Sequence, residues 1–157
     1  MLEVYPNLFI GSEGECFFKD RDDWAVIHAC KSPCHQKAVG YKGNLSPTHP
    51  NYLTYEVRNH LFLNMIDPPA PLFKPQLFMA SLDFIEKHIS ERKVLIHCNL
   101  GLSRSPSIAL LYLAKRAKVI NGESYMKATQ DFRKLFRYYK PRRGIAVYLD
   151  LYWLEFQ

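Results

Sequence analysis

Short apolar runs bounded by turn residues predict strands along the first two thirds of the chain. Pro6 and Asn7 mark a turn between two of these runs, because both residue types favour turns. Arg58 and Asn59 separate another pair by the length of a tight hairpin turn, although the usual glycine is absent. The predicted strands are residues 2–10 (two strands around the turn), 24–30, 55–57, 60–63 and 93–97.

Apolar positions three or four residues apart predict four helices in the second half of the chain. They are marked by Phe78, Leu82, Ile85 and Ile89, by residues 107–115, by Tyr125, Ala128, Phe132 and Leu135, and by Val147, Leu151 and Leu154. Pro106 fits the first position of the second helix, where its missing N–H is no loss. Strands first and helices later, around one sheet, predict an α/β or α+β domain with about five strands.

Two stretches without such periodicity predict loops. Residues 31–53 hold three prolines, two glycines and two asparagines among mostly polar neighbours, and loops of this length are usually functional or mobile. Residues 67–71 place three prolines behind an aspartate and predict a second, exposed loop. Because no repeat or long linker divides the chain, residues 1–157 are predicted to form a single domain.

The composition narrows the class of protein. With 48% hydrophobic residues the chain can bury a core, yet no run approaches the roughly 20 apolar residues that span a bilayer. The first residues lack the basic-then-apolar order of a signal peptide, and Leu2 stands where myristoylation requires glycine. We therefore expect a cytoplasmic protein without membrane association.

The formal net charge of +6 favours anionic partners, and nucleic acid, acidic proteins and phosphate-bearing substrates are all compatible with it. Six basic residues gather near the C-terminus. They form either a solvated helical face and loop or a patch that faces a substrate. These residues are Arg133, Lys134, Arg137, Lys140, Arg142 and Arg143.

The four cysteines, at positions 16, 30, 34 and 98, are too few and too irregular for a disulfide framework, and we expect free thiols. His28, Cys30, Cys34 and His35 are candidate metal ligands by residue type. Their spacing does not match a standard zinc pattern, so a hydrogen-bonded buried histidine and packing or loop thiols are the preferred interpretation. No metal or other cofactor is predicted.

The segment from His97 to Ser105 carries the chemistry. It runs from the end of a predicted strand to the start of a predicted helix, where backbone N–H groups and the helix dipole favour an anion such as phosphate. Gly101 permits a backbone conformation that a side chain would obstruct. Arg104 adds a planar, permanently charged fork that suits two phosphate oxygens.

Cys98 is predicted to lie at the bottom of this concavity as a nucleophile. The surrounding N–H groups and Arg104 would stabilise its thiolate, which is the reactive form of cysteine. Ser105 lies where its hydroxyl can donate to the sulfur and help it leave again. The alternative is that Cys98 is an inert buried thiol and Arg104 a surface residue. That interpretation requires neither the spacing nor the helix start, so the pattern favours a nucleophile.

The pattern His-Cys-x5-Arg-Ser resembles the signature of the protein tyrosine phosphatase superfamily. It is most similar to the dual-specificity branch, in which the residue before the arginine is typically serine, as Ser103 is here. The likeness extends weakly from Tyr5 to Ile145. It implies a mostly parallel sheet flanked by helices, a two-step phosphocysteine mechanism and no metal. It also implies that the amides of Asn99, Leu100, Gly101, Leu102 and Ser103 bind phosphate together with Arg104, and that His97 supports the loop through hydrogen bonds.

The family also implies a general acid, an aspartate on a loop about thirty residues before the nucleophile. Asp67 lies 31 residues before Cys98, inside the proline-rich loop. Protonation of the departing oxygen typically contributes about 10²–10⁴-fold to the rate. An ordinary turn aspartate before proline is the alternative. Asp83 and Asp131 fall in predicted helices and are poor rivals.

The resemblance implies phosphorylated proteins as substrates, with phosphate or sulfate bound in the active-site loop. A chain of this size has little room for the loop that deepens the phosphotyrosine pocket, so phosphoserine and phosphothreonine should also enter. If the long loop 31–53 folds over the entrance, it would set specificity instead. Three alternatives stay open: an RNA 5′-phosphatase, although nucleic acid is disfavoured by Ser105; a phosphoinositide phosphatase, disfavoured because no lysine lies between Cys98 and Arg104; and a non-catalytic phosphate-binding module.

Overall fold

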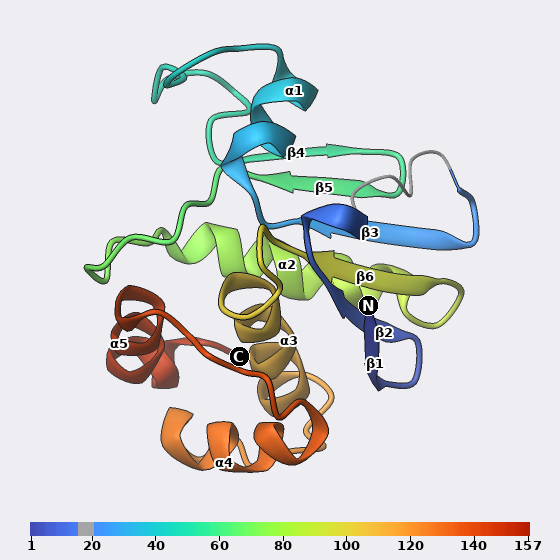
Figure 1. The fold of residues 1–157 in the computed structure, drawn as a ribbon, viewed down its shortest axis with the longest axis vertical. Coiled ribbons are helices and arrows are strands. Elements are labelled where there is room, and N and C mark those ends of the chain that lie inside the picture. The colour runs from blue at the N-terminus through green and yellow to red at the C-terminus, as the bar shows by residue number, and fades with distance from the viewer. Residues whose placement is uncertain (16–20) are drawn as a thin grey trace.

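A six-stranded sheet runs through the residues that the computed structural model describes, 1–15 and 21–157 (Figure 1). Its strands are β1 (Leu2–Tyr5), β2 (Leu8–Gly11), β3 (Trp24–His28), β4 (Thr54–Val57), β5 (His60–Leu63) and β6 (Lys93–His97). Their order is β1-β2-β6-β3-β5-β4, with the four inner strands parallel and the two edge strands antiparallel. The mostly parallel sheet is therefore confirmed, with six strands in place of about five.

The two edge hairpins turn where the sequence predicts. Asn7 and Arg58 both have a positive φ, 67° and 54°. Asparagine tolerates this left-handed conformation well, whereas arginine adopts it without that advantage. A hairpin turn without glycine is thus formed at Arg58 through the pairing of its flanking strands, in which Val57 faces His60.

The helices lie mainly on one side of this sheet. The helices and short turns are η1 (Glu13–Glu15), η2 (Lys31–His35), α1 (Gln36–Val39), α2 (Pro75–His88), α3 (Arg104–Lys115), α4 (Tyr125–Leu135), α5 (Arg143–Tyr152) and η3 (Trp153–Glu155). Helices α2 and α3 pack against the strands, α4 packs against α3, and Tyr148 of α5 stacks on Phe78 of α2. A smaller apolar cluster of Trp24, Val26 and Leu95 lies apart from the main core. Because successive strand residues point to opposite faces, β3 supplies side chains to both clusters.

Three details differ from the sequence predictions. Residues 31–53 are not a loop throughout, because η2 and α1 occupy their first third. Helix α3 begins at Arg104, so Pro106 is its third residue; proline is tolerated there because the first four N–H groups of a helix have no partner within it. The last helix exists, but Leu151 and Leu154 are exposed, and its buried face is formed by Ile145, Tyr148 and Leu149.

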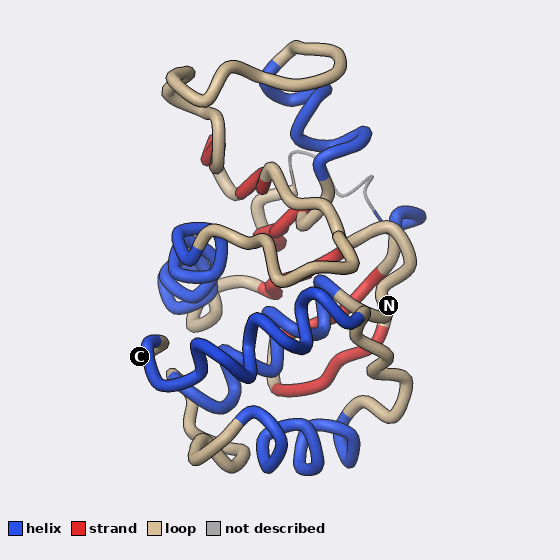
Figure 2. Tube along the Cα trace, turned by 90° about the vertical axis from the view of Figure 1, so that its left-hand side faces the viewer, coloured by secondary structure: helices blue, strands red, loops and turns tan. Residues whose placement is uncertain are grey.

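The segment 31–53 lies beyond the β4 edge of the sheet and extends away from the helices (Figures 1 and 2). A loop over residues 64–74 leads from β5 to α2 and passes between this segment and α5 (Figure 2). Within the described part of the chain, no helix has the length and apolar character needed to cross a membrane.

Candidate active site

The loop 98–103 connects the end of β6 to the start of α3, at the edge where the parallel strands end. Gly101 has a φ of +74°, and a Cβ at this position would lie 2.9 Å from the carbonyl oxygen of Gly11. A side chain would therefore be strained and would collide with the end of β2. Glycine is thus required at position 101 for two separate reasons, its dihedral angle and the close approach of the neighbouring strand.

Cys98 is buried beneath this loop and faces the first turn of α3. Its Sγ lies 3.2 Å from the Ser105 Oγ, and the backbone N–H of Ser105 donates to it over 3.4 Å. That N–H is available because the first turn of a helix leaves its donors unpaired within the helix. The Ser105 hydroxyl also lies 3.4 Å from the carbonyl oxygen of Gly11. The sulfur therefore lies at the N-terminal, positive end of α3, in contact with both polar groups of Ser105.

The Arg104 side chain is held in place by two hydrogen bonds. Its Nη1 donates to the carbonyl oxygen of Met65 over 2.8 Å, and its Nη2 donates to the Asn99 Oδ1 over 2.5 Å. Its Nε lies 4.0 Å from the Asp67 Oδ2, and both side chains are only 11% exposed. The Arg104 Nε and the Asp67 Oδ1 are buried without a hydrogen-bond partner among the residues described. A buried donor and a buried acceptor of this kind are typical of a ligand site.

Asp67 lies in the 64–74 loop, and this loop packs closely on the start of α5. A Cβ on Gly144 would overlap the carbonyl oxygen of Pro68 and would also press against that of Ala70. Glycine is therefore required at position 144 for the loop to approach the helix this closely. The position of Asp67 depends on a glycine 77 residues later in the chain.

These groups surround one cleft of about 520 Å³. Its lining comprises Asp67, Cys98, Asn99, Leu100, Leu102, Ser103, Arg104, Lys140, Pro141 and Arg142. Three of the predicted site residues, His97, Gly101 and Ser105, are buried beside it. The structure thus brings all the predicted site residues to one place.

Two of the six clustered basic residues reach this cleft. The Lys140 N–H donates to the Leu102 carbonyl over 2.9 Å, and the Arg142 N–H donates to the Ser103 Oγ over 3.0 Å. The segment 140–142 is therefore fastened to the loop by its backbone, which leaves its cationic side chains at the rim. Lys134 instead pairs with Asp131 at 3.6 Å on a solvated helix face. The structure therefore places Lys140 and Arg142 at the cleft and Lys134 on a solvated face; contact of the first two with a substrate stays a prediction.

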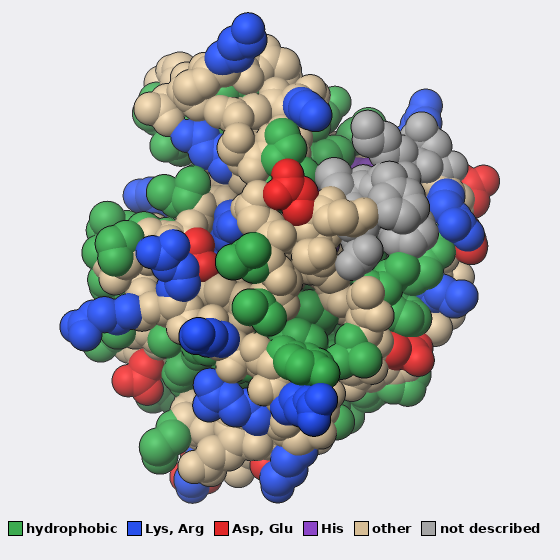
Figure 3. Space-filling model, viewed as in Figure 1, with side chains coloured by type: hydrophobic (Ala, Val, Ile, Leu, Met, Phe, Trp, Pro, Cys, Tyr) green, Lys and Arg blue, Asp and Glu red, His purple; other side chains and the backbone are tan. Residues whose placement is uncertain are grey.

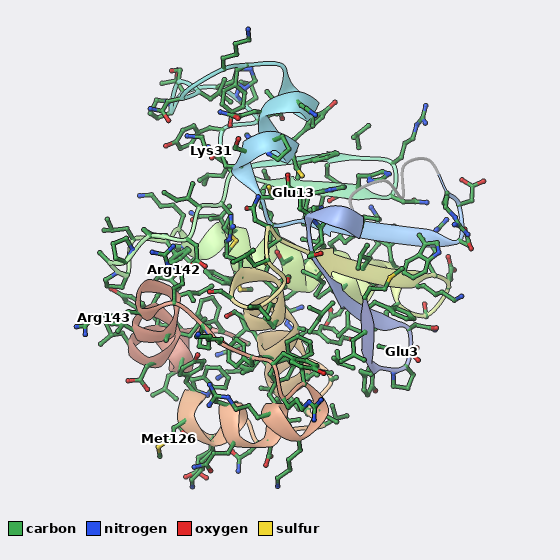
Figure 4. All side chains as sticks on the ribbon, viewed as in Figure 1. Glu3, Glu13, Lys31, Met126, Arg142 and Arg143 are labelled. Carbon is green, nitrogen blue, oxygen red and sulfur yellow. The ribbon has the colours of Figure 1, made fainter. Side chains whose placement is uncertain are left out.

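The basic residues give this side of the molecule a visible character. Lysine and arginine side chains gather over α4 and α5 on the face shown in Figure 3. Arg142 lies nearer the loop 98–103 than Arg143, which extends outward (Figure 4). An anionic ligand that approaches the cleft from this side would meet a favourable electrostatic field.

A chain of three buried histidines supports the site from below. His28 Nδ1 lies 2.7 Å from His97 Nε2, and His28 Nε2 lies 3.0 Å from His60 Nδ1. The side chains meet because His28 and His97 are paired in register on neighbouring strands. The prediction of a hydrogen-bonded buried histidine at position 28 is confirmed. His97 is tied to β3 by this contact, and its support of the loop stays a prediction.

The cysteines and histidines weighed as metal ligands do not come together as a set. Ligand atoms within 4.8 Å of one another belong to His28, Cys34 and His97. His35 instead contacts the Tyr41 hydroxyl at 2.7 Å and the Asn51 carbonyl at 2.9 Å. The described cysteines, Cys30, Cys34 and Cys98, are free thiols, and Cys16 lies outside the described residues.

The Cys30 thiol lies near the site. A hydrogen bond from Cys34 lowers the pKa of Cys30 to about 6, and the positive charge of Arg104 acts in the same direction, while burial opposes both. The guanidinium of the site therefore influences the sulfur of Cys30 as well as contacting Met65 and Asn99.

The side chain of Asn99 is a feature that the sequence analysis missed, because it assigned only the backbone amide of this residue. The Oδ1 accepts from Arg104, while the Nδ2 donates to the Glu13 Oε2 over 3.2 Å and to the Ser32 carbonyl over 3.3 Å. Asn99 thereby joins η1, η2 and the arginine (Glu13 is labelled in Figure 4). An amide beside the predicted nucleophile, able both to donate and to accept, was the available signal.

Comparisons with known proteins agree with one another. The sequence profile of the family described as "Dual specificity phosphatase, catalytic domain" matches residues 26–139. Human dual specificity protein phosphatase 16 is 31% identical over 78% of this chain and 16% of its own length. The tyrosine-protein phosphatase vhp-1 of Caenorhabditis elegans is 34% identical over 89% of this chain and 18% of its own length. The chain thus spans less than a fifth of these curated relatives.

Solved structures share the fold. Human DUSP28 superposes with a TM-score of 0.67 at 19% identity, covering 99% of this chain and 96% of that one. The human tyrosine phosphatase-like serine/threonine/tyrosine-interacting protein superposes with a TM-score of 0.64 at 22% identity, covering 97% and 94%. At such identities the likeness concerns the fold alone.

Proposed function

The chain belongs to the family of dual specificity phosphatase catalytic domains, and on that premise we propose that it hydrolyses phosphate monoesters of proteins through a phosphocysteine on Cys98. The observation that carries the proposal is the surrounding of the Cys98 sulfur. Its Sγ receives the Ser105 N–H, lies 3.2 Å from the Ser105 Oγ, and opens into a cleft that Arg104 and Asp67 also line.

In the first step the Cys98 thiolate attacks phosphorus, so that an S–P bond forms and the ester P–O bond breaks. Asp67 gives its proton to the departing oxygen, which leaves as an alcohol or phenol. Arg104 supplies its Nε–H and a remaining Nη–H to the phosphoryl oxygens, because its other contacts, to Met65 and Asn99, use only one hydrogen on each Nη.

In the second step the Asp67 carboxylate takes a proton from water, and the resulting hydroxide attacks phosphorus while the S–P bond breaks. The electron pair returns to Cys98, where Ser105 stabilises the leaving thiolate. We assign binding of the phosphoryl oxygens to the amides of Asn99, Leu100, Gly101, Leu102 and Ser103, whose loop faces the cleft with Arg104. Inorganic phosphate is the product, and the enzyme returns to its starting protonation state.

We infer that residues 1–157 act as one catalytic unit on phosphotyrosine and on phosphoserine or phosphothreonine in proteins. Phosphate or sulfate would bind in the same loop. We further propose action in the cytosol, where the thiols of Cys30, Cys34 and Cys98 would stay reduced. The non-catalytic alternative is disfavoured because nucleophile, arginine and aspartate all border one cleft.

Rapid-quench kinetics with para-nitrophenyl phosphate test the proposal. The wild-type protein should release a burst of nitrophenolate and form an acid-trapped phosphoprotein. The Cys98→Ser variant should show neither, while it still binds tungstate in calorimetry. Cys30→Ser is the matched control, since it replaces another buried thiol and should keep turnover. Normal turnover by Cys98→Ser would refute the mechanism.

A substrate panel tests the class of substrate. Phosphotyrosine and phosphoserine peptides, a phosphoinositide and an RNA 5′-triphosphate are compared by kcat/KM at one ionic strength. Peptides should be preferred. A clear preference for the lipid or the RNA would replace the protein-substrate assignment while leaving the chemistry in place.

A further inference from the structure

A second groove lies beside the cleft, between the segment 31–53 and the loop 64–74. It encloses about 310 Å³. One wall carries Lys31, Leu45 and Tyr52 from the segment, and the other carries Ile66, Leu72 and Lys74 from the loop. Lys31 and Arg142 lie on the same side of the molecule with this loop between them (Figure 4).

The groove and the cleft share the short stretch Met65–Asp67. Met65 and Ile66 line the groove, whereas Asp67, the next residue, lines the cleft. The carbonyl oxygen of Met65 accepts from the Lys31 N–H over 3.0 Å and from the Arg104 Nη1 over 2.8 Å. A polypeptide that leaves the cleft past Asp67 therefore has only this short stretch of the loop to cross before it reaches the groove.

The groove combines apolar walls with positive charge. Ile66 and Leu72 are 56% and 75% exposed, and both line the groove, so they offer apolar surface there to a ligand. Lys31 and Lys74 stand at its edges, and none of the described residues that line it is acidic. The chemistry fits an apolar side chain with an acidic neighbour, as found in a peptide.

The wall from the segment 31–53 is preformed. His35 is buried and contacts Tyr41 and Asn51 through its two ring nitrogens. On the other side the Asn64 Nδ2 donates to the Tyr52 carbonyl over 2.8 Å, which fastens the segment to the loop 64–74. Rigid walls reduce the entropy lost on binding, so even a small groove can contribute to affinity.

We propose that this groove binds the part of a phosphorylated protein that flanks the phosphorylated residue. An apolar side chain of the substrate packs against Ile66 and Leu72, and an acidic residue beside it meets Lys31 or Lys74. The inference rests on the proposed function and adds to it the local sequence that the enzyme prefers. It assigns to the segment 31–53 the role of a specificity element.

The first experiment uses phosphotyrosine peptides in which one leucine–glutamate pair is moved through the positions flanking the phosphorylated residue. The best peptide should exceed an all-alanine peptide in kcat/KM by about tenfold, the scale of one apolar side chain in a pocket. Leu72→Ser and Lys74→Glu should each remove most of this gain while changing kcat/KM for para-nitrophenyl phosphate less than twofold.

Matched controls separate the groove from general surface effects. Leu154 is 81% exposed and does not line the groove, so Leu154→Ser should leave the peptide preference intact. Lys134→Glu serves the same purpose for charge. In the Cys98→Ser background, Leu72→Ser should weaken peptide binding about tenfold and tungstate binding not at all.

The outcomes distinguish the two proposals. If no variant or wild-type protein hydrolyses para-nitrophenyl phosphate, the proposed function fails. If hydrolysis is normal but the peptide preference is absent, or survives Leu72→Ser and Lys74→Glu, the groove proposal is overturned. Preference for a phosphoinositide vesicle or an RNA end, unaffected by Leu72→Ser, would also overturn it.

Discussion

Two loops leave the sheet side by side, and they are built in different ways. The loop 98–103 follows β6, and the segment 31–53 follows the neighbouring parallel strand β3. The Ala29 N–H donates to the His97 carbonyl over 2.9 Å, so the two chain segments diverge only after this hydrogen bond. Their proposed roles nevertheless differ. The loop 98–103 binds phosphate through its backbone amides, whereas the segment 31–53 forms one wall of the neighbouring groove.

The first loop is shaped by backbone constraints, whereas the second is shaped by side chains. Gly101 must be glycine because of its dihedral angle and its contact with Gly11. The segment 31–53 depends on His35, which bridges Tyr41 and Asn51. Backbone constraints leave a local signature in sequence, while side-chain bridges leave only scattered polar residues. The type of reaction is therefore easier to predict from the sequence than the preference for one substrate.

The two loops are also joined, since the Asn99 Nδ2 donates to the Ser32 carbonyl over 3.3 Å. If the division of labour is correct, changes around the first loop should reduce turnover of every substrate. Changes within the segment 31–53 should leave small aryl phosphates almost unaffected.

The largest expected effect concerns the acid. Asp67→Ala should slow hydrolysis of an alkyl phosphate about 10²–10⁴-fold, because an alkoxide departs poorly without a proton. The loss should be much smaller for para-nitrophenyl phosphate, whose leaving group needs less assistance. Steady-state kcat for a series of leaving groups measures this. An equal loss across the series would remove Asp67 from the role of general acid.

An intermediate effect is expected at the support of the acid. Gly144→Ala should push the loop 64–74 away from α5, because the new methyl group would overlap the Pro68 carbonyl. Displacing a catalytic group by about 1 Å can cost around 10²-fold, so we expect a ten- to hundredfold fall in kcat for alkyl phosphates. Gly40→Ala is a control, since a Cβ there meets no atom within 4 Å although its φ of +94° adds strain. Equal kinetics for Gly144→Ala and wild type would contradict the packing argument.

The smallest effect on turnover is expected from the bridge in the segment 31–53. Burial lowers the pKa of His35 below its ordinary value of 6.5, and the charges of Lys31 and His49 act in the same direction, against the hydrogen bond to Asn51. The opened segment therefore binds a proton more readily than the closed one. The stability that His35 contributes is complete above pH 6.5 and declines as the pH falls through 6.5 toward the lower folded value.

Amide hydrogen exchange checks this sign. In the wild-type protein, protection of the amides of residues 41–51, corrected for intrinsic rates, should fall as the pH is lowered from 7.5 to 5.5. In His35→Gln, kcat for para-nitrophenyl phosphate at pH 7.5 should change less than twofold. The variant should also lose the pH dependence of protection in this segment. Burial also lowers the pKa of His88, so His88→Gln is the control. This variant should retain the pH dependence of protection in residues 41–51. Protection that rises toward acid pH would refute the assignment.

Much of the fold followed from local patterns. Periodicity located α2 and α4, a short apolar run located β6, and the turn residues located both edge hairpins. The buried face of α5 was misjudged, because Val147, Leu151 and Leu154 recur at helical spacing just as Ile145, Tyr148 and Leu149 do. Contacts with α2 and α4 decide which face of α5 is buried, and the local sequence of α5 does not reveal these contacts.

The candidate site divides in the same manner. The residues from His97 to Ser105 could be recognised because one short stretch combines nucleophile, glycine and arginine. The contributions of Met65 and Gly144 could not, since each acts through a partner distant in sequence. The Asn99 side chain was missed although its partner Arg104 lies within the same stretch. Whether the recognised residues perform the proposed steps stays a prediction for the kinetic experiments.

The Ser105 hydroxyl has one proton and two acceptors within reach, the Cys98 sulfur at 3.2 Å and the Gly11 carbonyl at 3.4 Å. Rotation about a single bond is enough to turn that proton toward the sulfur when it is negative and toward the carbonyl when the sulfur is esterified. The site would then follow the charge through each cycle with a molecular rotor, while its heavy atoms stay still and little reorganisation energy is required.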